Sequence, residues 1–247
     1  MAIQKEALKN ITVARKGGDW DNMKILNLYA GIGGNRKLWG DQHEITAVEY
    51  KPEIAKIYQD FFPNDKVIVA DAHQYLLDHF SEFDFIWSSP PCPTHSKARY
   101  GLGFHGGKVP AIYPDMRLYQ EIIILQTHFT GKWCVENVMA YYRPLIPPNK
   151  IGRHWYWSNF CMTDLYVESS HIAQESKEYS ASPTRIFKVS DFEKEYGYDL
   201  SKHNIRNKRL LLRNCVEPKT GKHILDCAIN SPSLFEETNK IRSAPLL

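Results

Sequence analysis

Long apolar runs, paired cysteines and a strong excess of one charge are all missing from this sequence. No stretch approaches the roughly 20 apolar residues that a membrane-spanning helix requires, and the amino-terminal MAIQKEALKN has no apolar signal core. The net charge of +3 over 247 residues is mildly basic and by itself leaves nucleic-acid binding open. We therefore expect a cytoplasmic protein without a membrane segment.

The few cysteines exclude two further kinds of protein. They are odd in number, scattered and never arranged as CxxC, so neither a disulfide framework nor a zinc knuckle is expected. Hydrophobic residues make up 43% of the chain and charged residues 24%, which is typical of a folded domain with an apolar core. The cysteines are Cys92, Cys134, Cys161, Cys215 and Cys227.

Strand-like and helix-like segments alternate through the first half of the chain. Short apolar runs predict strands at 23–30, 44–50, 66–70, 83–88 and 132–137. Amphipathic segments predict helices at 51–62, 73–80 and 115–129. This alternation is typical of an α/β fold, a parallel sheet with helices on both faces. Ligands of such sheets bind beyond the carboxyl ends of the strands.

The pattern changes in the second half. Residues 152–160 are aromatic and strand-like, whereas 161–204 are polar and irregular apart from a strand-like run at 184–189. A basic patch, RNKRLLLRN at 206–214, precedes a predicted final helix at 220–229. Basic clusters of this kind recur in DNA-binding proteins, although a merely solvated face is the alternative.

A glycine-rich turn follows the first predicted strand, in NLYAGIGGNRKLW. Glycines permit positive φ and close approach of a ligand, and the spacing is not the GxGxxG of dinucleotide sites. Glu49 ends the second strand and Asp71 the third, where carboxylates suit ribose hydroxyls and an adenine amino group. For Asp71 a helix N-cap is an equally good interpretation. The combination fits an adenosine ligand without a pyrophosphate, such as S-adenosylmethionine.

A cysteine stands between prolines after the fourth predicted strand, in FDFIWSSPPCPTHSKAR. The prolines restrict the backbone of Cys92, and His95, Lys97 and Arg99 supply positive charge just downstream. Positive charge lowers the pKa of a thiol, so we expect Cys92 to be a nucleophile. The alternative is a buried structural cysteine, an interpretation that suits Cys134 on the next strand better.

A carboxylate then emerges from the apolar strand KWCVENV. Partial burial suits Glu136 to holding or donating a proton. The alternatives are an ion-paired strand end for Glu136 and a turn former for Asn137.

In this order the segments resemble the DNA cytosine-5-methyltransferases, from Ile25 to about Ile229. LYAGIGG is similar to the family's cofactor motif, SSPPCPTHS to its Pro-Cys motif, and ENV to the motif that follows. Arg153 in GRHWYW resembles an arginine-bearing strand, and RNCVEP a late motif that completes the cofactor pocket. The resemblance implies a Rossmann-like S-adenosylmethionine-dependent methyltransferase sheet with a small irregular target-recognition region.

The resemblance also implies boundaries and site residues. A catalytic domain would span 20–160, the target-recognition region 161–205 and a returning segment 206–247. The catalytic residues would be Cys92, Glu136, Asn137 and Arg153. The cofactor contacts would come from Tyr29, Ala30, Gly31, Gly33, Gly34, Glu49, Asp71, Ala72, Pro90, Asn214 and Val216. The DNA contacts would come from Ser96, Lys97, Arg99, Arg206, Lys208 and Arg209. No metal is implied, and the partner is double-stranded DNA bound by a monomer.

The implied reaction adds Cys92 to carbon 6 of a flipped-out cytosine, which makes carbon 5 nucleophilic. Glu136 would contact ring nitrogen 3, and Arg153 the base oxygen or a phosphate. Residues 93–114 suit a lid, or else a glycine-rich surface loop. The sequence departs from the family pattern at Pro93, which replaces Gln, at Tyr29, which replaces Phe, and in the arginine pair, which is reduced to Arg-His. The short recognition region predicts a sequence specificity that is either loose or carried partly by other loops, and it suits a phage or mobile-element enzyme.

Three alternatives stay open. A carbon-5 methyltransferase acting on tRNA would use the same thiol and glutamate. An amino-group methyltransferase would place an aromatic residue where Cys92 stands. A degenerate accessory subunit would bind the cofactor without retaining the residues of the reaction.

Overall fold

Seven strands form one sheet in the described part of the chain, in the order β3-β2-β1-β4-β5-β7-β6. The computed structural model describes residues 20–97, 110–163 and 188–231. The strands are β1 (Lys24–Leu28), β2 (Glu44–Glu49), β3 (Lys66–Val69), β4 (Phe85–Ser88), β5 (Lys132–Val138), β6 (Asn149–Ile151) and β7 (His154–Ser158). Strands β1 to β5 are parallel, which confirms the expected α/β sheet.

One edge of the sheet differs from the expectation. β7 is the strand predicted within 152–160, but it runs antiparallel to β5, and the sequence does not predict its partner β6. Only residues 152–153 connect β6 to β7. So short a connection permits only an antiparallel pair, whereas parallel strands need a long crossover.

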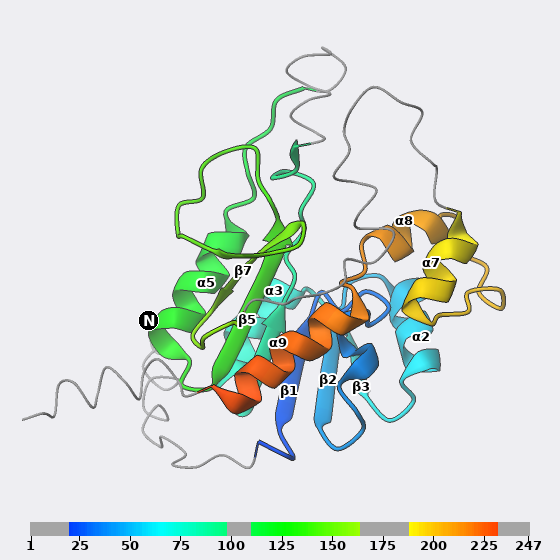
Figure 1. Ribbon diagram of the computed structural model, residues 1–247, viewed down its shortest axis with the longest axis horizontal. Helices are drawn as coiled ribbons and strands as arrows, with labels where there is room; N and C mark the ends of the chain where they lie inside the picture. The colour runs from blue at the N-terminus through cyan, green and yellow to red at the C-terminus, as the bar shows by residue number, and fades with distance from the viewer. Residues whose placement is uncertain (1–19, 98–109, 164–187, 232–247) are drawn as a thin grey trace, which may run out of the picture.

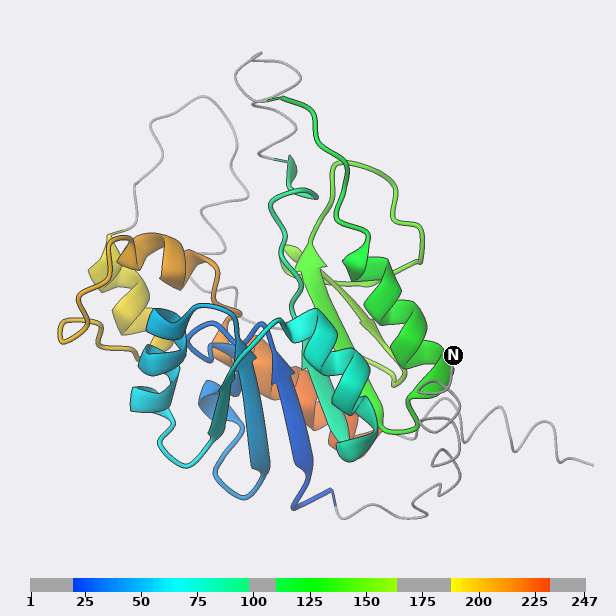
Figure 2. The same cartoon turned by 180° about the vertical axis from the view of Figure 1, so that it is seen from behind.

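Helices cover both faces of the sheet, as Figures 1 and 2 show from opposite sides. One face carries the 3₁₀ helix η2 (Asn35–Leu38), α2 (Pro52–Phe61) and α9 (Pro218–Asn230); the other carries α3 (Ala72–His79), the 3₁₀ helix η3 (Phe80–Glu82) and α5 (Arg117–His128). The side chains of β1 show why both faces are covered. Ile25 packs in the core with α9, whereas Leu26 and Leu28 pack on the opposite face with α3 and α5. Side chains alternate across a strand, so a strand with apolar residues on both faces is buried from both sides.

The described end of the 161–205 region contains one helix that the sequence does not predict, followed by an irregular segment. α7 (Val189–Tyr196) lies beside α8 (Lys208–Arg213) next to α2 (Figure 1). Phe192 and Tyr196 of α7 are buried together with side chains of α2. The strand-like run predicted at 184–189 is wrong where it is described, because Lys188 is the N-cap of α7 and Val189 its first residue. The other residues of that run lie outside the described part.

The last described helix returns to the start of the sheet. α9 confirms the helix predicted at 220–229, and it packs against η2, where the Trp39 indole N–H donates to the Gly221 carbonyl at 3.0 Å. A Cβ at Gly221 would lie 2.4 Å from the Asn35 carbonyl oxygen, so the helix and the turn approach this closely only because residue 221 is glycine. None of the helices described has the length and apolarity to cross a membrane.

Candidate active site

The candidate residues gather at the carboxyl ends of the parallel strands, the upper edge of the sheet in Figure 1. The glycine turn follows β1, Glu49 ends β2, and Asp71 follows β3. The proline-cysteine segment follows β4, and β5 carries Glu136 and Asn137 near its end. Since β1 lies between β2 and β4, the turn sits at the point where the strand order reverses, where α/β sheets bind ligands.

The glycines of the turn have different physical roles. Gly33 has φ +82°, and a Cβ there would lie 2.4 Å from a ring carbon of Phe62; a Cβ at Gly34 would lie 2.4 Å from the Val216 carbonyl oxygen. These two glycines therefore permit close packing within the protein. Gly31 has φ +56° and nothing within 4 Å of its Cβ position, so the open space at this turn lies beside Gly31. Tyr29 is also left-handed, with φ +55°.

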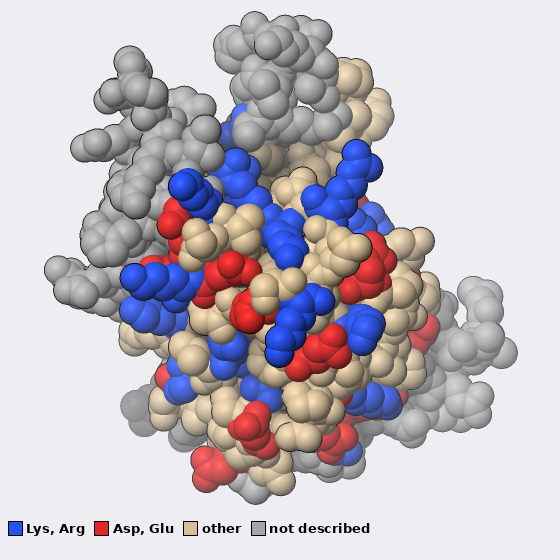
Figure 3. Space-filling view, turned by 90° about the vertical axis from the view of Figure 1, so that its right-hand side faces the viewer, with Lys and Arg blue, Asp and Glu red and all other residues tan. Residues whose placement is uncertain are grey.

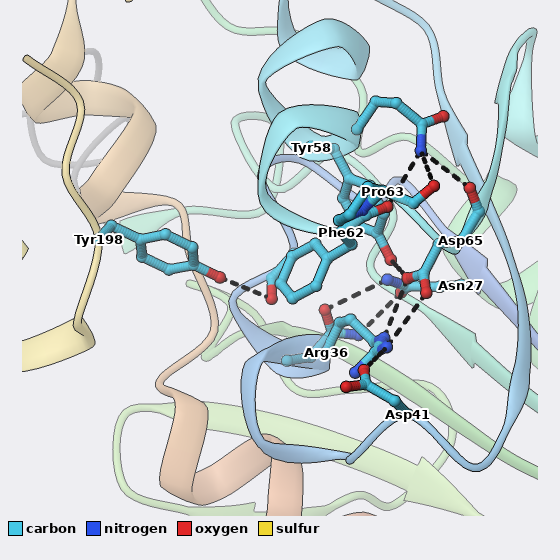
Figure 4. Close-up of polar contacts among 11 residues, drawn as sticks. Asn27, Arg36, Asp41, Tyr58, Phe62, Pro63, Asp65 and Tyr198 are labelled. Carbon is cyan, nitrogen blue, oxygen red and sulfur yellow. Dashed lines mark hydrogen bonds and ion pairs between the residues drawn. The ribbon is translucent and has the colours of Figure 1, made fainter. Parts of the chain in front are cut away.

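A buried polar cluster supports the turn from below (Figure 4). Arg36, at the start of η2, donates from Nε and Nη2 to both oxygens of Asp65 at 2.9 and 3.1 Å, and the Tyr58 hydroxyl donates to Asp65 Oδ2 at 2.8 Å. From the other side, the Tyr198 hydroxyl donates to the Gly33 carbonyl at 2.8 Å. The cluster holds η2 and the turn against α2 and the segment after α7.

The two acids at the strand ends make backbone hydrogen bonds. Glu49 accepts the Gly31 N–H at Oε2 and the Lys51 N–H at Oε1, both at 3.0 Å. Asp71 accepts the N–H groups of His73 and Gln74 at Oδ1, so the N-cap interpretation of Asp71 is confirmed. Glu49 is half-buried and Asp71 exposed, so both carboxylates lie at the surface of the same edge.

The segment that presents Cys92 is held on several sides. Asn137, buried at the end of β5, donates from Nδ2 to the Pro90 carbonyl at 2.9 Å. Thr94 Oγ1 accepts the Asp115 N–H at 2.9 Å, and Nδ1 of His95 lies 2.6 Å from the Tyr142 hydroxyl. Asn137 thus holds the segment that bears Cys92, which is a more specific task than that of the turn former expected from the sequence.

The expected activation of Cys92 by flanking positive charge is wrong for the described residues. Burial, and after it the negative charge of Glu136, raise the pKa of the Cys92 thiol above its ordinary value. His95 is buried, and desolvation lowers the pKa of its ring, so it is neutral at pH 7. Lys97 is exposed, and Arg99 lies outside the described residues. Sequence proximity put these bases near the thiol, but the turn directs His95 into the protein.

Glu136 lies near His154, a neighbour that the sequence does not predict. Its Oε1 lies 3.6 Å from Nε2 of His154 on β7, and Glu136 itself is 8% exposed. The antiparallel register, which pairs Glu136 with Tyr156 and Val138 with His154, brings the two strands together. Arg153 is exposed in the β6–β7 turn, beyond the carboxyl end of β5.

The late motif and the basic patch lie near this edge. Val216 is buried against Gly34, whereas Asn214 is the exposed C-cap of α8. Arg206 and Arg209 are exposed, but the Lys208 ammonium donates to the Leu200 carbonyl. Figure 3 shows the face that carries α2, α7 and α8, where lysine and arginine side chains gather in the upper half with acidic side chains among them. The basic patch therefore lies on a face of mixed charge.

Comparison with known proteins shows which family this part of the chain is similar to. The profile of the C-5 cytosine-specific DNA methylases matches residues 23–139, which include the glycine turn, Cys92 and Glu136. That match covers the five parallel strands and the segments that follow them. The Type II methyltransferase M.Bsp6I of Bacillus sp. (strain RFL6) is 33% identical over 89 residues, which are 35% of this chain and 28% of that protein. The chain therefore spans less than a third of the length of the curated relative that it matches.

Solved methyltransferase structures are also similar. A mutant of Spodoptera frugiperda DNMT2 is 29% identical, with 47% of this chain and 35% of that chain covered at a TM-score of 0.32. An S-adenosylmethionine-dependent methyltransferase from Agrobacterium tumefaciens is 15% identical, with 57% and 45% covered at a TM-score of 0.36. The α/β fold rests on the strand order and the parallel pairing of this chain's own sheet.

S-adenosylmethionine is the cofactor of C-5 methylases, and the residues present fit it. The open space beside Gly31 lets a ligand approach the backbone, and the carboxylates of Glu49 and Asp71 border the same edge. Hydroxyl and amino groups of an adenosine suit carboxylate acceptors. The residues that would hold the cofactor are Tyr29, Ala30, Gly31, Gly33, Gly34, Glu49, Asp71, Ala72, Pro90, Asn214 and Val216. Of these, Gly33, Gly34 and Val216 would act through packing of the turn.

Proposed function

We propose that this protein methylates carbon 5 of cytosine in double-stranded DNA. The observation that carries the proposal is that Cys92 follows β4 and Glu136 lies on the adjacent strand β5, at the edge that bears the glycine turn. The two groups are close enough for the Glu136 charge to raise the pKa of the Cys92 thiol. A nucleophile and an acid–base group beside a methyl-donor site are the components that carbon-5 methylation needs.

The raised pKa of Cys92 indicates how the reaction is controlled. In the free protein, burial and the negative charge of Glu136 keep the thiol protonated. When a flipped-out cytosine enters, Glu136 takes up a proton from solvent and shares it with ring nitrogen 3 while it accepts a hydrogen bond from the exocyclic amine, so its negative charge no longer opposes the thiolate. The Sγ–C6 bond then forms, the thiol proton leaves to solvent, and carbon 5 gains nucleophilic character. When bound, S-adenosylmethionine supplies an electrophilic methyl group.

The other site residues have assigned tasks in this proposal. Asn137 donates a hydrogen bond to the Pro90 carbonyl and so fixes the position of Cys92 beyond the end of β4. Arg153 contacts the base oxygen or its phosphate from the β6–β7 turn. Nε2 of His154 on β7 lies 3.6 Å from Oε1 of Glu136 and so limits the movement of the carboxylate at this edge of the sheet. After methyl transfer a base removes the carbon-5 proton and the cysteine leaves.

DNA contacts in the proposal come from both sides of the edge. Ser96, Lys97, Arg206 and Arg209 meet phosphates, whereas Lys208 is already engaged by the Leu200 carbonyl. Because such contacts are electrostatic, the affinity that they give for DNA should fall steeply as the salt concentration rises. Residues 161–205 recognise the target, with α7 anchoring that region to α2. Arg99 and most of the 93–114 lid lie outside the described residues.

A methyl-transfer assay with a matched cysteine control tests the proposal. The protein is incubated with labelled S-adenosylmethionine and unmethylated duplex DNA, and 5-methylcytosine is located by bisulfite sequencing. The Cys92→Ser variant should bind DNA and transfer no methyl group, whereas Cys161→Ser, at an exposed cysteine, should be fully active. An active Cys92→Ser protein would refute the mechanism. Methylation of a structured RNA but not of DNA would refute the substrate.

A covalent trap tests the bond to sulfur separately. A duplex with 5-fluorocytosine at the methylated position should form a stable adduct on Cys92 in the presence of cofactor, detected as a mass increase on the Cys92 peptide. Fluorine cannot leave as the proton does, so the adduct accumulates. Turnover of ordinary DNA without an adduct on the fluorinated duplex would exclude the proposed bond.

A further inference from the structure

A buried carboxylate that the proposed reaction does not use lies behind the site. Glu121, on α5, is 1% exposed. The Tyr29 hydroxyl donates to its Oε1 at 2.5 Å, the Ser88 hydroxyl donates to its Oε2 at 2.6 Å, and Nδ1 of His73 lies 2.9 Å from Oε1. Burying a carboxylate is costly unless donors replace its water. All three donors here come from elements other than α5.

Each of the donors adjoins a different loop of the site. Tyr29 begins the glycine turn after β1. Ser88 is the last residue of β4, and the segment that bears Cys92 follows it. His73 lies in the first turn of α3, which Asp71 caps. One carboxylate therefore connects the three loops at the carboxyl ends of β1, β3 and β4.

The bond from Tyr29 has a particular consequence for the turn. Tyr29 has φ +55°, a conformation that non-glycine residues rarely adopt and that persists only when surrounding contacts hold it. Burial and then the Glu121 charge raise the pKa of the Tyr29 hydroxyl well above its ordinary value, so the hydroxyl keeps its proton and donates. The hydrogen bond to Glu121 first, and the charge of Glu121 as well, raise the pKa of His73, while Arg117 opposes this and Asp71 adds to it.

We propose that Glu121 is the positioning residue of the cofactor turn: through the Tyr29 hydroxyl it holds residue 29 in its left-handed conformation and thereby sets the affinity for S-adenosylmethionine. The inference rests on the proposed function for the identity of the ligand. A phenylalanine at position 29, as in the family pattern, has no group to offer this carboxylate. The tyrosine and the buried glutamate therefore act as a pair in this chain.

Binding of S-adenosylhomocysteine by titration calorimetry tests the pair without DNA or turnover. The variants are Tyr29→Phe, which removes only the hydroxyl, Glu121→Gln, which removes the charge and replaces one acceptor oxygen by an amide N–H donor, and the double variant. Glu53→Gln, at an exposed position on α2, makes the same chemical change away from the site. Loss of a hydrogen bond to a charged group corresponds to about a tenfold loss of affinity. We expect that loss in each single variant and none in Glu53→Gln.

The double variant distinguishes positioning from general loosening of the fold. Residues that act through one shared bond have non-additive effects, so the double variant should bind no more weakly than Glu121→Gln alone. The KM for S-adenosylmethionine should rise in all three variants while kcat at saturating cofactor stays within about twofold of wild type. Additive losses of affinity, or wild-type affinity in Tyr29→Phe, would overturn the inference.

Three further outcomes have definite meanings. If Glu121→Gln fails to fold by circular dichroism, Tyr29→Phe decides alone, because its ring keeps the packing and only the hydroxyl is lost. A protein that binds S-adenosylhomocysteine with the expected variant pattern but methylates no cytosine would contradict the proposed function and leave this inference standing. A protein that methylates DNA while Tyr29→Phe binds the cofactor as wild type would contradict the inference alone.

Discussion

Replacement of Arg36 by methionine should destabilise the protein strongly. The side chains of Arg36 and Asp65 are 4% and 3% exposed, and they are joined by two hydrogen bonds at 2.9 and 3.1 Å. Methionine fills the space of the stem but leaves the Asp65 charge buried with the Tyr58 hydroxyl as its donor at 2.8 Å. Removing one partner of a buried pair costs about 3–5 kcal/mol.

That free energy is a large part of the total, since folded proteins are stable by about 5–15 kcal/mol. For a chain of this size 1 kcal/mol corresponds to about 2–4 °C in Tm, so Arg36→Met should lower Tm by roughly 6–20 °C. Because Arg36 follows the glycine turn directly, affinity for S-adenosylhomocysteine should fall together with stability.

The matched control uses an exposed pair in the same part of the fold. Lys56 and Asp60 on α2 are 76% and 42% exposed with an N–O distance of 3.5 Å. Exposed pairs contribute about 0–1 kcal/mol, so Lys56→Met should change Tm by no more than roughly 4 °C. Thermal and urea unfolding measure both variants. If Arg36→Met costs no more than Lys56→Met, the reasoning from burial is refuted.

Three more predictions follow from contacts at the edge. Glu136→Gln should lower the pKa of the Cys92 thiol, because the Glu136 charge raises it, and iodoacetamide should then alkylate Cys92 faster at neutral pH; an unchanged rate would contradict this. The pKa of His73 is raised in the folded state, so its contribution to stability should be complete below the ordinary value of 6.5 and should disappear as pH rises through the raised value. Urea unfolding of His73→Gln and wild type across pH measures this, and a difference that grows with pH would refute it. Gly34→Ala should weaken cofactor binding and lower Tm, since its Cβ would lie 2.4 Å from the Val216 carbonyl oxygen. A variant with wild-type affinity would contradict this, because the turn would then accommodate the methyl group without weaker binding.

Much of the parallel half of the fold follows from local pattern. The strands β1 to β5 and the helices between them lie where short apolar runs and amphipathic segments predict them. Each segment shows the hydrophobic pattern of its own helix or strand. A helix between two neighbouring strands provides the long crossover connection that parallel strands need. The family match over 23–139 covers the same stretch, so motif order and periodicity agree there.

Prediction failed where the deciding contact is distant in sequence. α7 carries Phe192 and Tyr196 at helical spacing, but its polar neighbours hide the pattern unless the apolar surface of α2 is known. His154 meets Glu136 only through the antiparallel register of β5 and β7. Glu121 reads as one acidic residue of an amphipathic helix, and only the fold brings three donors to it.

The sequence by itself determined the order of the strands along the chain, the motifs at their ends and the types of residue available for chemistry. Those properties depend on neighbours a few positions apart. The tertiary structure decided the electrostatics: it turned His95 inward, brought the Glu136 charge to bear on Cys92, and linked Tyr29, Ser88 and His73 through one buried carboxylate. The strength of a charge depends on burial and on its partners, and both are set by residues far away in the chain.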